Sequence, residues 1–382
     1  METLRRWVPL IIVVCSCLYL QRLVAHRLLA SRPARDNAAL RRFIARALTF
    51  ASVWVGIVLP ILAEIHIRWM PANMALFLLA ASLFWICIVV SAGIWCWFSH
   101  HAETFHPDRR RFLALGAPVA AAPIAMAGFG TYLARNGMVQ QQVDLRLPHL
   151  ARDLNGLRIA QLTDIHFGPF FGRAALQRAV DMANEYRPHL IFLTGDLVTR
   201  RGDDLDSCLN VLRGLKSEAG IYCCHGNHEI YADVLDYATA QGTRFGFHFL
   251  RRQAALLRFG DARLNLAGYD YQRLHTPYLP GAESLVVPGT TNILLQHNPD
   301  TFPRAAQAGF DVTLCGHTHG GQINFEILHE NLNAARIFTP FVRGLYERDQ
   351  KLVYVSSGLG TVAMPVRLGA PPEVTLLRLC DI

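Results

Sequence analysis

The pattern of apolar and polar positions changes near residue 135. Before it, long apolar runs are separated by short polar segments. Beyond it, short β-rich runs alternate with amphipathic segments. Runs of about 20 apolar residues predict bilayer-spanning helices, whereas the alternating pattern predicts an α/β fold with a largely parallel sheet. We therefore expect a transmembrane region over residues 1–135, a polar connector over 136–150 and a folded domain over 151–382.

Four apolar segments predict the membrane spans. They cover about residues 7–24, 47–65, 74–98 and 112–133. The first is the weakest, because Gln21 and Arg22 interrupt its end. A single such run could be a buried core helix, but four in succession with aromatic flanks favour a multi-pass membrane region. We expect no cleavable signal peptide, since no Ala-x-Ala-like site follows the first run.

The basic charge lies in this apolar region. The net charge is +8; the first 112 residues hold 13 arginines and 5 acids, whereas residues 136–382 hold 23 basic and 24 acidic residues. This argues for positive-inside flanks and against a nucleic-acid surface on the folded domain. The arginines between the first two spans, with Arg109–Arg111, predict cytoplasmic loops there. The folded domain then faces outward.

Arg109–Arg111 permits two interpretations. Followed by Phe112 and an Ala/Gly/Pro-rich apolar run, it is similar to a twin-arginine export motif. It is equally an ordinary positive-inside cluster. Both send the following domain outward, and both stay open.

Strands and helices alternate along the folded domain. Predicted strands begin at Leu157, His189, Gly220, Arg263, Thr291, Asp311, Leu352 and Val374, and predicted helices cover Arg173–Tyr186, Asp204–Leu215 and Tyr231–Ala240. Three of the nine cysteines, Cys223, Cys224 and Cys315, fall in these strands without CxxC spacing. We expect them to be buried apolar residues.

Metal-capable side chains recur where the predicted strands end. They are Asp164, His166, Asp196, Asn227, His297, His317 and His319. Ligands gather at the carboxyl ends of strands in such sheets, so these side chains should converge. The strand period of two should point Asp164 and His166 the same way. Mixed oxygen and imidazole donors suit Mn, Fe or Zn and suit Ca poorly.

Seven ligands are enough for two divalent ions, with Asp196 placed to bridge them. Such a pair clamps the attacking and leaving oxygens of a phosphoryl displacement and provides hydroxide near neutral pH. His228 follows Asn227 directly, so its side chain should diverge from that ligand. It is then placed to protonate the leaving oxygen, and we expect His228 and Asp196 to be the catalytic residues.

The ordered set Asp164-x-His166, Gly195-Asp196, Gly226-Asn227-His228-Glu229, His297 and Gly316-His317-x-His319 resembles the calcineurin-like metallophosphoesterases. The resemblance covers about residues 155–382. It implies a four-layer αββα sandwich with two facing mixed sheets. It also implies one metal held by Asp164, His166, Asp196 and His319, a second held by Asp196, Asn227, His297 and His317, and His228 as the catalytic histidine.

Later segments are similar to a membrane-attached bacterial branch of that family, which implies the inner membrane of a bacterium. These are Arg343-Gly-Leu-Tyr346, Ser357-Gly-Leu-Gly360 and Pro365–Glu373. The insert Asn324–Thr339 departs from the branch near the predicted site, so substrate preference cannot be carried over. Arg367 is a weak candidate for substrate contact, and Tyr269, Asp270 and Tyr271 are candidates for the entrance.

We expect a membrane-anchored two-metal phosphoesterase that hydrolyses phosphodiesters or phosphomonoesters by attack of a metal-bound hydroxide. Lipid-linked or envelope phosphates are compatible substrates. The alternative is a non-catalytic metal-binding membrane sensor with the same fold. A third interpretation keeps the enzyme but turns its domain to the cytoplasm, where phosphoproteins or nucleotides become the substrates.

Overall fold

The computed structural model describes residues 2–30, 35–58, 72–104, 109–272, 278–327, 330–362 and 364–382. The chain forms two compact units, Met1–Phe129 and Gly130–Ile382. The end of the second predicted span, residues 59–65, lies outside the described residues. Each unit is considered by itself.

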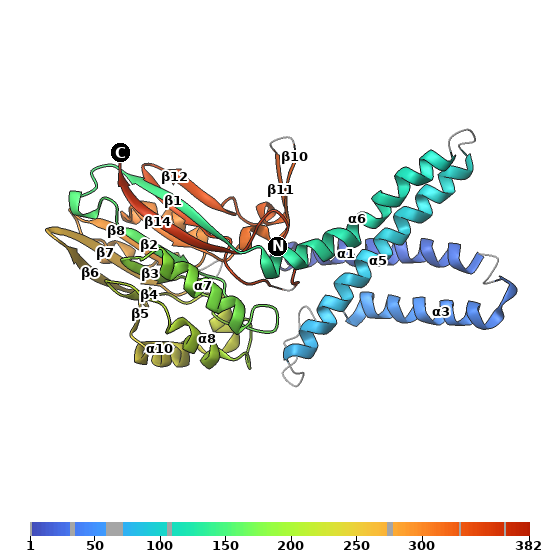
Figure 1. Ribbon diagram of the computed structural model, residues 1–382, viewed down its shortest axis with the longest axis horizontal. Helices are drawn as coiled ribbons and strands as arrows, with labels where there is room; N and C mark the ends of the chain where they lie inside the picture. Colours follow the sequence, from blue (N-terminus) through green and yellow to red (C-terminus); the bar gives the residue numbers. More distant parts are fainter. Residues whose placement is uncertain are drawn as a thin grey trace. The chain divides into compact units, whose positions relative to one another are not determined.

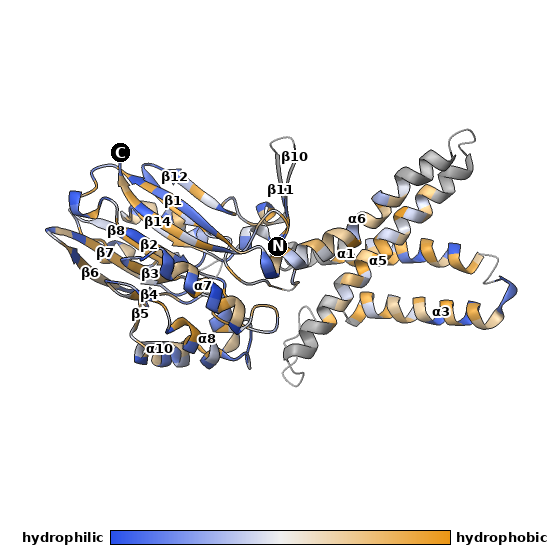
Figure 2. Cartoon of the chain, viewed as in Figure 1, coloured by the Kyte–Doolittle hydropathy of each residue, from blue (hydrophilic) through white to orange (hydrophobic). Residues whose placement is uncertain are grey.

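Long helices make up the first unit (Figure 1). They are α1 (Glu2–Ala30), α3 (Ala38–Val53), α5 (Ala72–Thr104) and α6 (Arg109–Asn136), with a π-helical turn, η1 (Trp54–Val58), after α3. Apolar residues run along α1, α3 and α5 (Figure 2). Within the described residues, one helix is long and apolar enough to cross a membrane, Gly116–Asn136, and Phe84–Phe98 is a shorter apolar helix. The structure thus supports the fourth predicted span and leaves the four-span bundle unconfirmed.

Polar side chains connect three of these helices. Gln21 of α1 is 1% exposed and donates to Ser52 Oγ of α3 at 2.6 Å and to the Leu48 carbonyl at 2.8 Å. Its oxygen accepts from Trp85 Nε1 of α5 at 3.2 Å. Trp54 Nε1 donates to the buried Ser82 Oγ at 2.6 Å. The residue that weakened the first predicted span is therefore a buried, hydrogen-bonded contact between helices.

Two six-stranded mixed sheets form the second unit (Figure 1). The first has the order β1 (Val139–Leu147), β14 (Glu373–Asp381), β2 (Arg158–Leu162), β3 (Leu190–Leu193), β4 (Ile221–Cys223) and β5 (Phe247–Phe249). The second has the order β12 (Gly344–Arg348), β13 (Lys351–Val355), β9 (Val312–Cys315), β8 (Thr291–Gln296), β7 (Ala262–Tyr269) and β6 (Gln253–Phe259). A separate hairpin joins β10 (Asn324–Ile327) and β11 (Glu330–Asn333).

Apolar cores define the layers of this unit. Phe192, Ile159 and Leu377 of the first sheet pack with Leu266 and Leu314 of the second, so the sheets face each other. A second core joins the other face of the first sheet to helices, and a third joins the second sheet to one helix. These helices are α7 (Arg173–Glu185), α8 (Leu205–Leu212), α10 (Leu235–Arg244) and α11 (Phe302–Ala308). The predicted pair of facing mixed sheets with helices outside is confirmed.

Two local predictions differ from the structure. Residues 139–147, predicted as connector, form the edge strand β1, parallel to β14. Only Leu145 and Leu147 of β1 are buried, so three consecutive glutamines concealed the strand pattern. The helix predicted over Tyr231–Ala240 is two helices, α9 (Asn227–Ala232) and α10. They are separated at Asp233, whose φ of 60° lies in the left-handed region and ends the first helix.

Candidate metal centre

Every predicted ligand lies just beyond the carboxyl end of a strand. Asp164 and His166 follow β2, Asp196 follows β3, and Asn227 begins α9 after β4. From the facing sheet, His297 follows β8, and His317 and His319 follow β9. The two sheets therefore deliver their ligands to one common edge.

Left-handed backbone, which costs energy in residues other than glycine, is concentrated in these loops. Five predicted ligands have positive φ: Asp164 (51°), His166 (46°), Asp196 (57°), His317 (76°) and His319 (53°). Asp164 and His166 do converge, but β2 ends at Leu162 and their backbone is not extended. Strand alternation was therefore the wrong reason for a correct prediction.

One cluster joins Asp164, His166 and His319. The Nε2 atoms of His166 and His319 are 3.1 Å apart, and His319 Nε2 is 3.3 Å from Asp164 Oδ1. All three residues are at most 5% exposed. The Asp164 carboxylate also accepts from the backbone N–H of His317 at 3.0 Å and from Thr163 Oγ1 at 2.9 Å. Its orientation is therefore fixed by donors from both sheets.

A neighbouring cluster joins Asp196, His297 and His317. Asp196 Oδ2 is 3.0 Å from His297 Nε2 and 3.6 Å from His166 Nε2, so this carboxylate lies between the two clusters. The His317 ring centroid is 5.1 Å from that of His297. Asn227 is 5% exposed, and its Oδ1 is buried with no hydrogen-bond partner among the described residues.

His228 lies beside both clusters and, like the predicted ligand His317, is half-buried. Its Nδ1 is 2.6 Å from the carbonyl of Thr199, which can only accept, so Nδ1 carries a proton. Its ring meets that of His166 edge to face at 4.6 Å between centroids. Its backbone N–H donates to Asp196 Oδ1 at 2.9 Å. The geometry fixes the tautomer and leaves Nε2 as the ring atom available for proton transfer.

Burial and neighbouring charge shift the pKa values at the site. Burial lowers the pKa of His317 to about 3, and it lowers the pKa of His166 and His319 well below the usual range. Burial also disfavours charge on His297, but the carboxylates of Asp196 and Asp164 outweigh it and raise its pKa to about 10. The imidazoles of His166, His317 and His319 are thus neutral, as metal ligation requires. A cation could replace the proton that His297 shares with Asp196.

Two glycines allow the loops to approach this closely. A Cβ on Gly316 would lie 2.1 Å from Asp164 Oδ2 and 2.4 Å from Thr163 Oγ1. A Cβ on Gly226 would lie 2.1 Å from Asp196 Oδ1. These positions require glycine because a carboxylate ligand occupies the space of the side chain, which explains why glycine precedes two of the ligand motifs.

Sequence reasoning assigned no role to Glu229, which is fully buried. Its carboxylate accepts three backbone N–H groups: Leu197 at 2.6 Å, Gly226 at 2.7 Å and Asp196 at 2.9 Å. It therefore joins the loop after β3 to the start of α9. The sequence signal was a glycine followed three residues later by glutamate, a pattern typical of a helix start.

Arg200 was also missed. It follows Thr199, which contacts His228 through its carbonyl and His166 Nδ1 through its hydroxyl at 3.1 Å. The Nε and Nη2 atoms of Arg200 are buried and make no hydrogen bond among the described residues. The carboxylate of Asp203 is 4.0 Å away. Buried donors of this kind, one residue from the site, are available to an anion.

Arg367 is 0% exposed, and its guanidinium donates to the carbonyls of Ser357, Gly360 and Ala370. Its Nη2 is 3.4 Å from His319 Nδ1. This placement gives the predicted substrate contact no support; it makes Arg367 a residue that holds a loop against a metal-site histidine.

The three candidates for the entrance, Tyr269, Asp270 and Tyr271, have different surroundings. The Tyr271 ring lies 5.2 Å from that of His317. Tyr269 is 3% exposed and donates to the Pro280 carbonyl at 3.1 Å, and Asp270 pairs with Arg251 at 2.8 Å. Tyr271 is therefore the one of the three that the described contacts place against the site.

These residues fit divalent metal ions. Two donors held about 2.1 Å from one ion lie about 3.0–3.4 Å apart at octahedral or tetrahedral angles. The separations of 3.1 Å between His166 and His319, 3.3 Å between His319 and Asp164, and 3.0 Å between His297 and Asp196 fall in that range. The unpartnered Oδ1 of Asn227 supplies a further donor.

Comparison with known proteins agrees with this chemistry. Residues 157–321 match the family model described as calcineurin-like phosphoesterase. The chain is 35% identical over 251 residues to a transmembrane protein with metallophosphoesterase domain from Danio rerio, covering 61% of this chain and 56% of that protein.

Two bacterial relatives match over nearly their whole length. The metallophosphoesterase YkuE of Bacillus subtilis (strain 168) is 29% identical over 288 residues, 71% of this chain and 97% of that protein. Phosphodiesterase YaeI of Escherichia coli (strain K12) is 28% identical over 293 residues, 71% of this chain and 99% of that protein. Residues 157–321 are therefore similar to calcineurin-like phosphoesterases, and the names of these relatives support a hydrolase of the metal-dependent phosphoesterase class.

Proposed function

We propose that the chain is a membrane-anchored phosphoesterase that uses two divalent ions, drawn from Mn, Fe and Zn, to hydrolyse a phosphodiester or phosphomonoester. One observation carries the proposal: six of the seven predicted ligands, from two facing sheets, converge on one edge, with the Asp196 carboxylate between two clusters. A single ion would leave several of these buried polar groups uncompensated.

The ligands divide naturally between two ions. We assign Asp164, His166 and His319 to the first position and His297, His317 and Asn227 to the second, with Asp196 shared. Ions bound there would supply positive charge to phosphoryl oxygens and lower the pKa of water. Arg367 and Glu229 hold the loops that carry these ligands, so the site is preorganised.

His228 is the proposed general acid. Its Nδ1 proton is held by the Thr199 carbonyl, so proton transfer to a leaving oxygen would come from Nε2. Arg200, with two buried N–H groups that lack acceptors among the described residues, is the proposed donor to a phosphoryl oxygen. Its neighbour Thr199 contacts both His166 and His228, so Arg200 is one residue along the chain from a partner of the proposed acid.

The exposure pattern of the first unit supports a membrane anchor. Its helices bury polar Gln21 and Ser82 at 1% exposure while Phe43 and Phe50 are 69% and 68% exposed. Polar contacts between helices and apolar outward faces suit a lipid environment, where interhelical hydrogen bonds stabilise packing. The four-span topology and the outward, extracytoplasmic orientation rest on the arginine distribution and are part of the proposal.

The substrate class follows from the site and its relatives. The Escherichia coli relative is named a phosphodiesterase, which supports a diester as the first substrate to test. Attachment to a membrane would bring lipid-linked or envelope phosphates near the site. Residues 136–382 hold 23 basic and 24 acidic residues, a balance that gives nucleic acid no support as the substrate.

The test is hydrolysis by the detergent-solubilised full chain loaded with Mn²⁺, on bis-p-nitrophenyl phosphate and p-nitrophenyl phosphate in parallel. We expect metal-dependent turnover that is lost on chelation. His228→Ala should lower kcat about 10²–10⁴-fold on a diester with an alkyl leaving group, because the leaving alkoxide loses its proton donor. The loss should be smaller on the two nitrophenyl esters, because p-nitrophenolate leaves without a proton.

The matched control is His248→Ala, an exposed histidine on β5, and it should leave kcat unchanged. Reporter fusions after Gln142 test the orientation separately. A folded chain that binds its metals but hydrolyses neither ester would contradict the proposed reaction and favour the sensor.

A further inference from the structure

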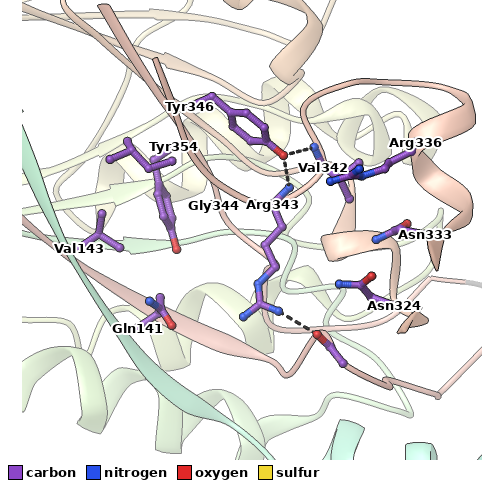
Figure 3. Close-up of a pocket in the computed structure, with 12 residues that line it drawn as sticks. Gln141, Val143, Asn324, Asn333, Arg336, Val342, Arg343, Gly344, Tyr346 and Tyr354 are labelled. Atoms are coloured by element: carbon purple, nitrogen blue, oxygen red, sulfur yellow. Dashed lines mark hydrogen bonds between the residues drawn. The ribbon is translucent and has the colours of Figure 1, made fainter. Parts of the chain in front are cut away.

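A cavity with a volume of about 530 Å³ has none of the predicted metal ligands among its lining residues. It is lined by β1 at the edge of one sheet, by β12 at the edge of the other and by the ends of the β10–β11 hairpin. Figure 3 shows Arg343 between Gln141 and Tyr354 on one side and Asn324 and Asn333 on the other. Its size is that of a site for a small organic ligand.

The lining is cationic and rich in amides. Arg336 and Arg343 line it, and no aspartate or glutamate is among the described lining residues. The Arg343 guanidinium makes one hydrogen bond within the described chain, from Nη1 to the Gly369 carbonyl at 2.8 Å. Its other N–H groups are available to an anion, for which the planar fork is suited.

Two further polar groups can each make an additional hydrogen bond. Asn324 Oδ1 is buried and accepts no hydrogen bond from the described residues. The Tyr346 hydroxyl accepts from the backbone N–H groups of Val342 and Arg343 at 2.9 and 3.2 Å, which leaves its own proton free to donate (Figure 3). A ligand that carries an anionic group together with hydroxyls would satisfy both the arginines and these neutral groups.

Exposed apolar residues lie on the segments that line the cavity, and we call them its apolar rim. Ile337 and Phe338 directly follow the lining residue Arg336 in the chain and are 79% and 63% exposed, and Leu345, itself a lining residue, is 42% exposed. Large apolar side chains next to arginine, around a cationic cavity, match the two layers of a lipid surface, with acyl chains beneath a phosphate layer. A soluble anion would give the apolar rim no partner.

The cavity is close in sequence to the end of the candidate membrane helix. Gly116–Asn136 ends five residues before Gln141, a distance of at most about 18 Å of extended chain. Within the second unit, the carbonyl of Gly130 accepts from the backbone N–H of Arg367 at 2.9 Å. The helix end is thus fixed to the loop that leads to Gly369 of the cavity wall.

We propose that this cavity binds the phosphate-bearing headgroup of an anionic membrane lipid, with Ile337, Phe338 and Leu345 in the interfacial layer of the bilayer. The proposal rests on the membrane attachment proposed above. The cavity wall is joined to a loop of the candidate metal centre, since Asn333 Nδ2 donates at 2.8 Å to the carbonyl of Gly320, the residue after the predicted ligand His319. Lipid binding would therefore steady the loop that carries a metal ligand.

The test uses the detergent-solubilised full chain with added phosphatidylglycerol, phosphatidylcholine or glycerol 1-phosphate. Hydrogen exchange of residues 336–346 reports whether the cavity is occupied, and native mass spectrometry reports the affinity for phosphatidylglycerol. We expect phosphatidylglycerol alone to protect this segment. Arg343→Gln should weaken its binding about tenfold or more, because a charge-assisted bond to phosphate is lost.

Arg336→Gln, at an exposed residue without a hydrogen bond in the described chain, should weaken binding severalfold and cannot act by disrupting internal contacts. Arg348→Gln, at the far end of β12 and outside the cavity, is the matched control. Equal protection by glycerol 1-phosphate would assign the cavity to a soluble anion and overturn the proposal. Unchanged lipid binding in both cavity variants would also overturn it.

Hydrolysis measured in the same samples keeps the two proposals apart. Metal-dependent turnover without lipid protection would refute the lipid site and leave the enzyme proposal standing. Lipid protection without turnover would support the lipid site and count against the proposed reaction.

Discussion

The carboxylate of Glu229 accepts the backbone N–H of Asp196 at 2.9 Å, and so fixes the residue shared by the two ligand clusters. It also accepts from Leu197 and Gly226, so one buried side chain holds two ligand loops. Burial raises the pKa of Glu229 to about 7. The three N–H donors favour its charged form.

Glu229→Gln should weaken metal binding about 10- to 100-fold. The amide has one accepting oxygen, so it cannot accept all three hydrogen bonds, and its NH₂ group would face backbone N–H donors. We expect a loss of about 1–3 kcal/mol in the free energy of unfolding. Isothermal titration with Mn²⁺ and chemical denaturation measure the two effects. The control is Glu218→Gln, 67% exposed, which should stay within about 0.5 kcal/mol of the parent. Equal metal affinity in the two variants would contradict this role.

Gly316→Ala should disrupt the site although it adds one methyl group. Its Cβ would lie 2.1 Å from Asp164 Oδ2, so the carboxylate or the His317 loop must shift. We expect a loss of about 1–3 kcal/mol in stability and a clear drop in metal content. At Gly168 the nearest atom to a new Cβ is 3.8 Å away, and Gly168→Ala is the control. Metal content equal to that of the control would contradict this close contact, because the loop would then have room for the added methyl group.

The buried cysteines should resist alkylation. Burial raises the pKa of Cys208, Cys223, Cys224 and Cys315 well above the usual value, and the thiolate is the reactive form. In the folded second unit at pH 8, iodoacetamide should therefore modify Cys380, which is partly exposed, and spare these four. Peptide mass spectrometry before and after denaturant measures this. Modification of the four at the rate of Cys380 would mean that the core opens.

The positions of the ligands could be predicted because parallel strands end at a common edge. Asp164, Asp196 and His297 each follow a short apolar run, and that local pattern was enough. The buried state of Cys223, Cys224 and Cys315 followed from the same strands and is confirmed. These features depend on a few neighbouring residues.

Features that depend on distant contacts could not be predicted. Arg367 lies in a turn between prolines, and only the fold reveals that its guanidinium is buried among carbonyls beside His319. The strand β1 was hidden by its glutamines because it pairs with β14, more than 200 residues away. The left-handed backbone at Asp164 and His319 has no sequence signal, since these residues gain their strain from the site they build.

The central claim is tested most directly by counting metal ions per chain by inductively coupled plasma mass spectrometry. We predict two ions per chain in the parent protein, one in His319→Ala and one in His297→Ala. Asp196→Asn should lose both, since its carboxylate is shared by the two positions. One ion in the parent, or two retained in Asp196→Asn, would contradict the two-metal site.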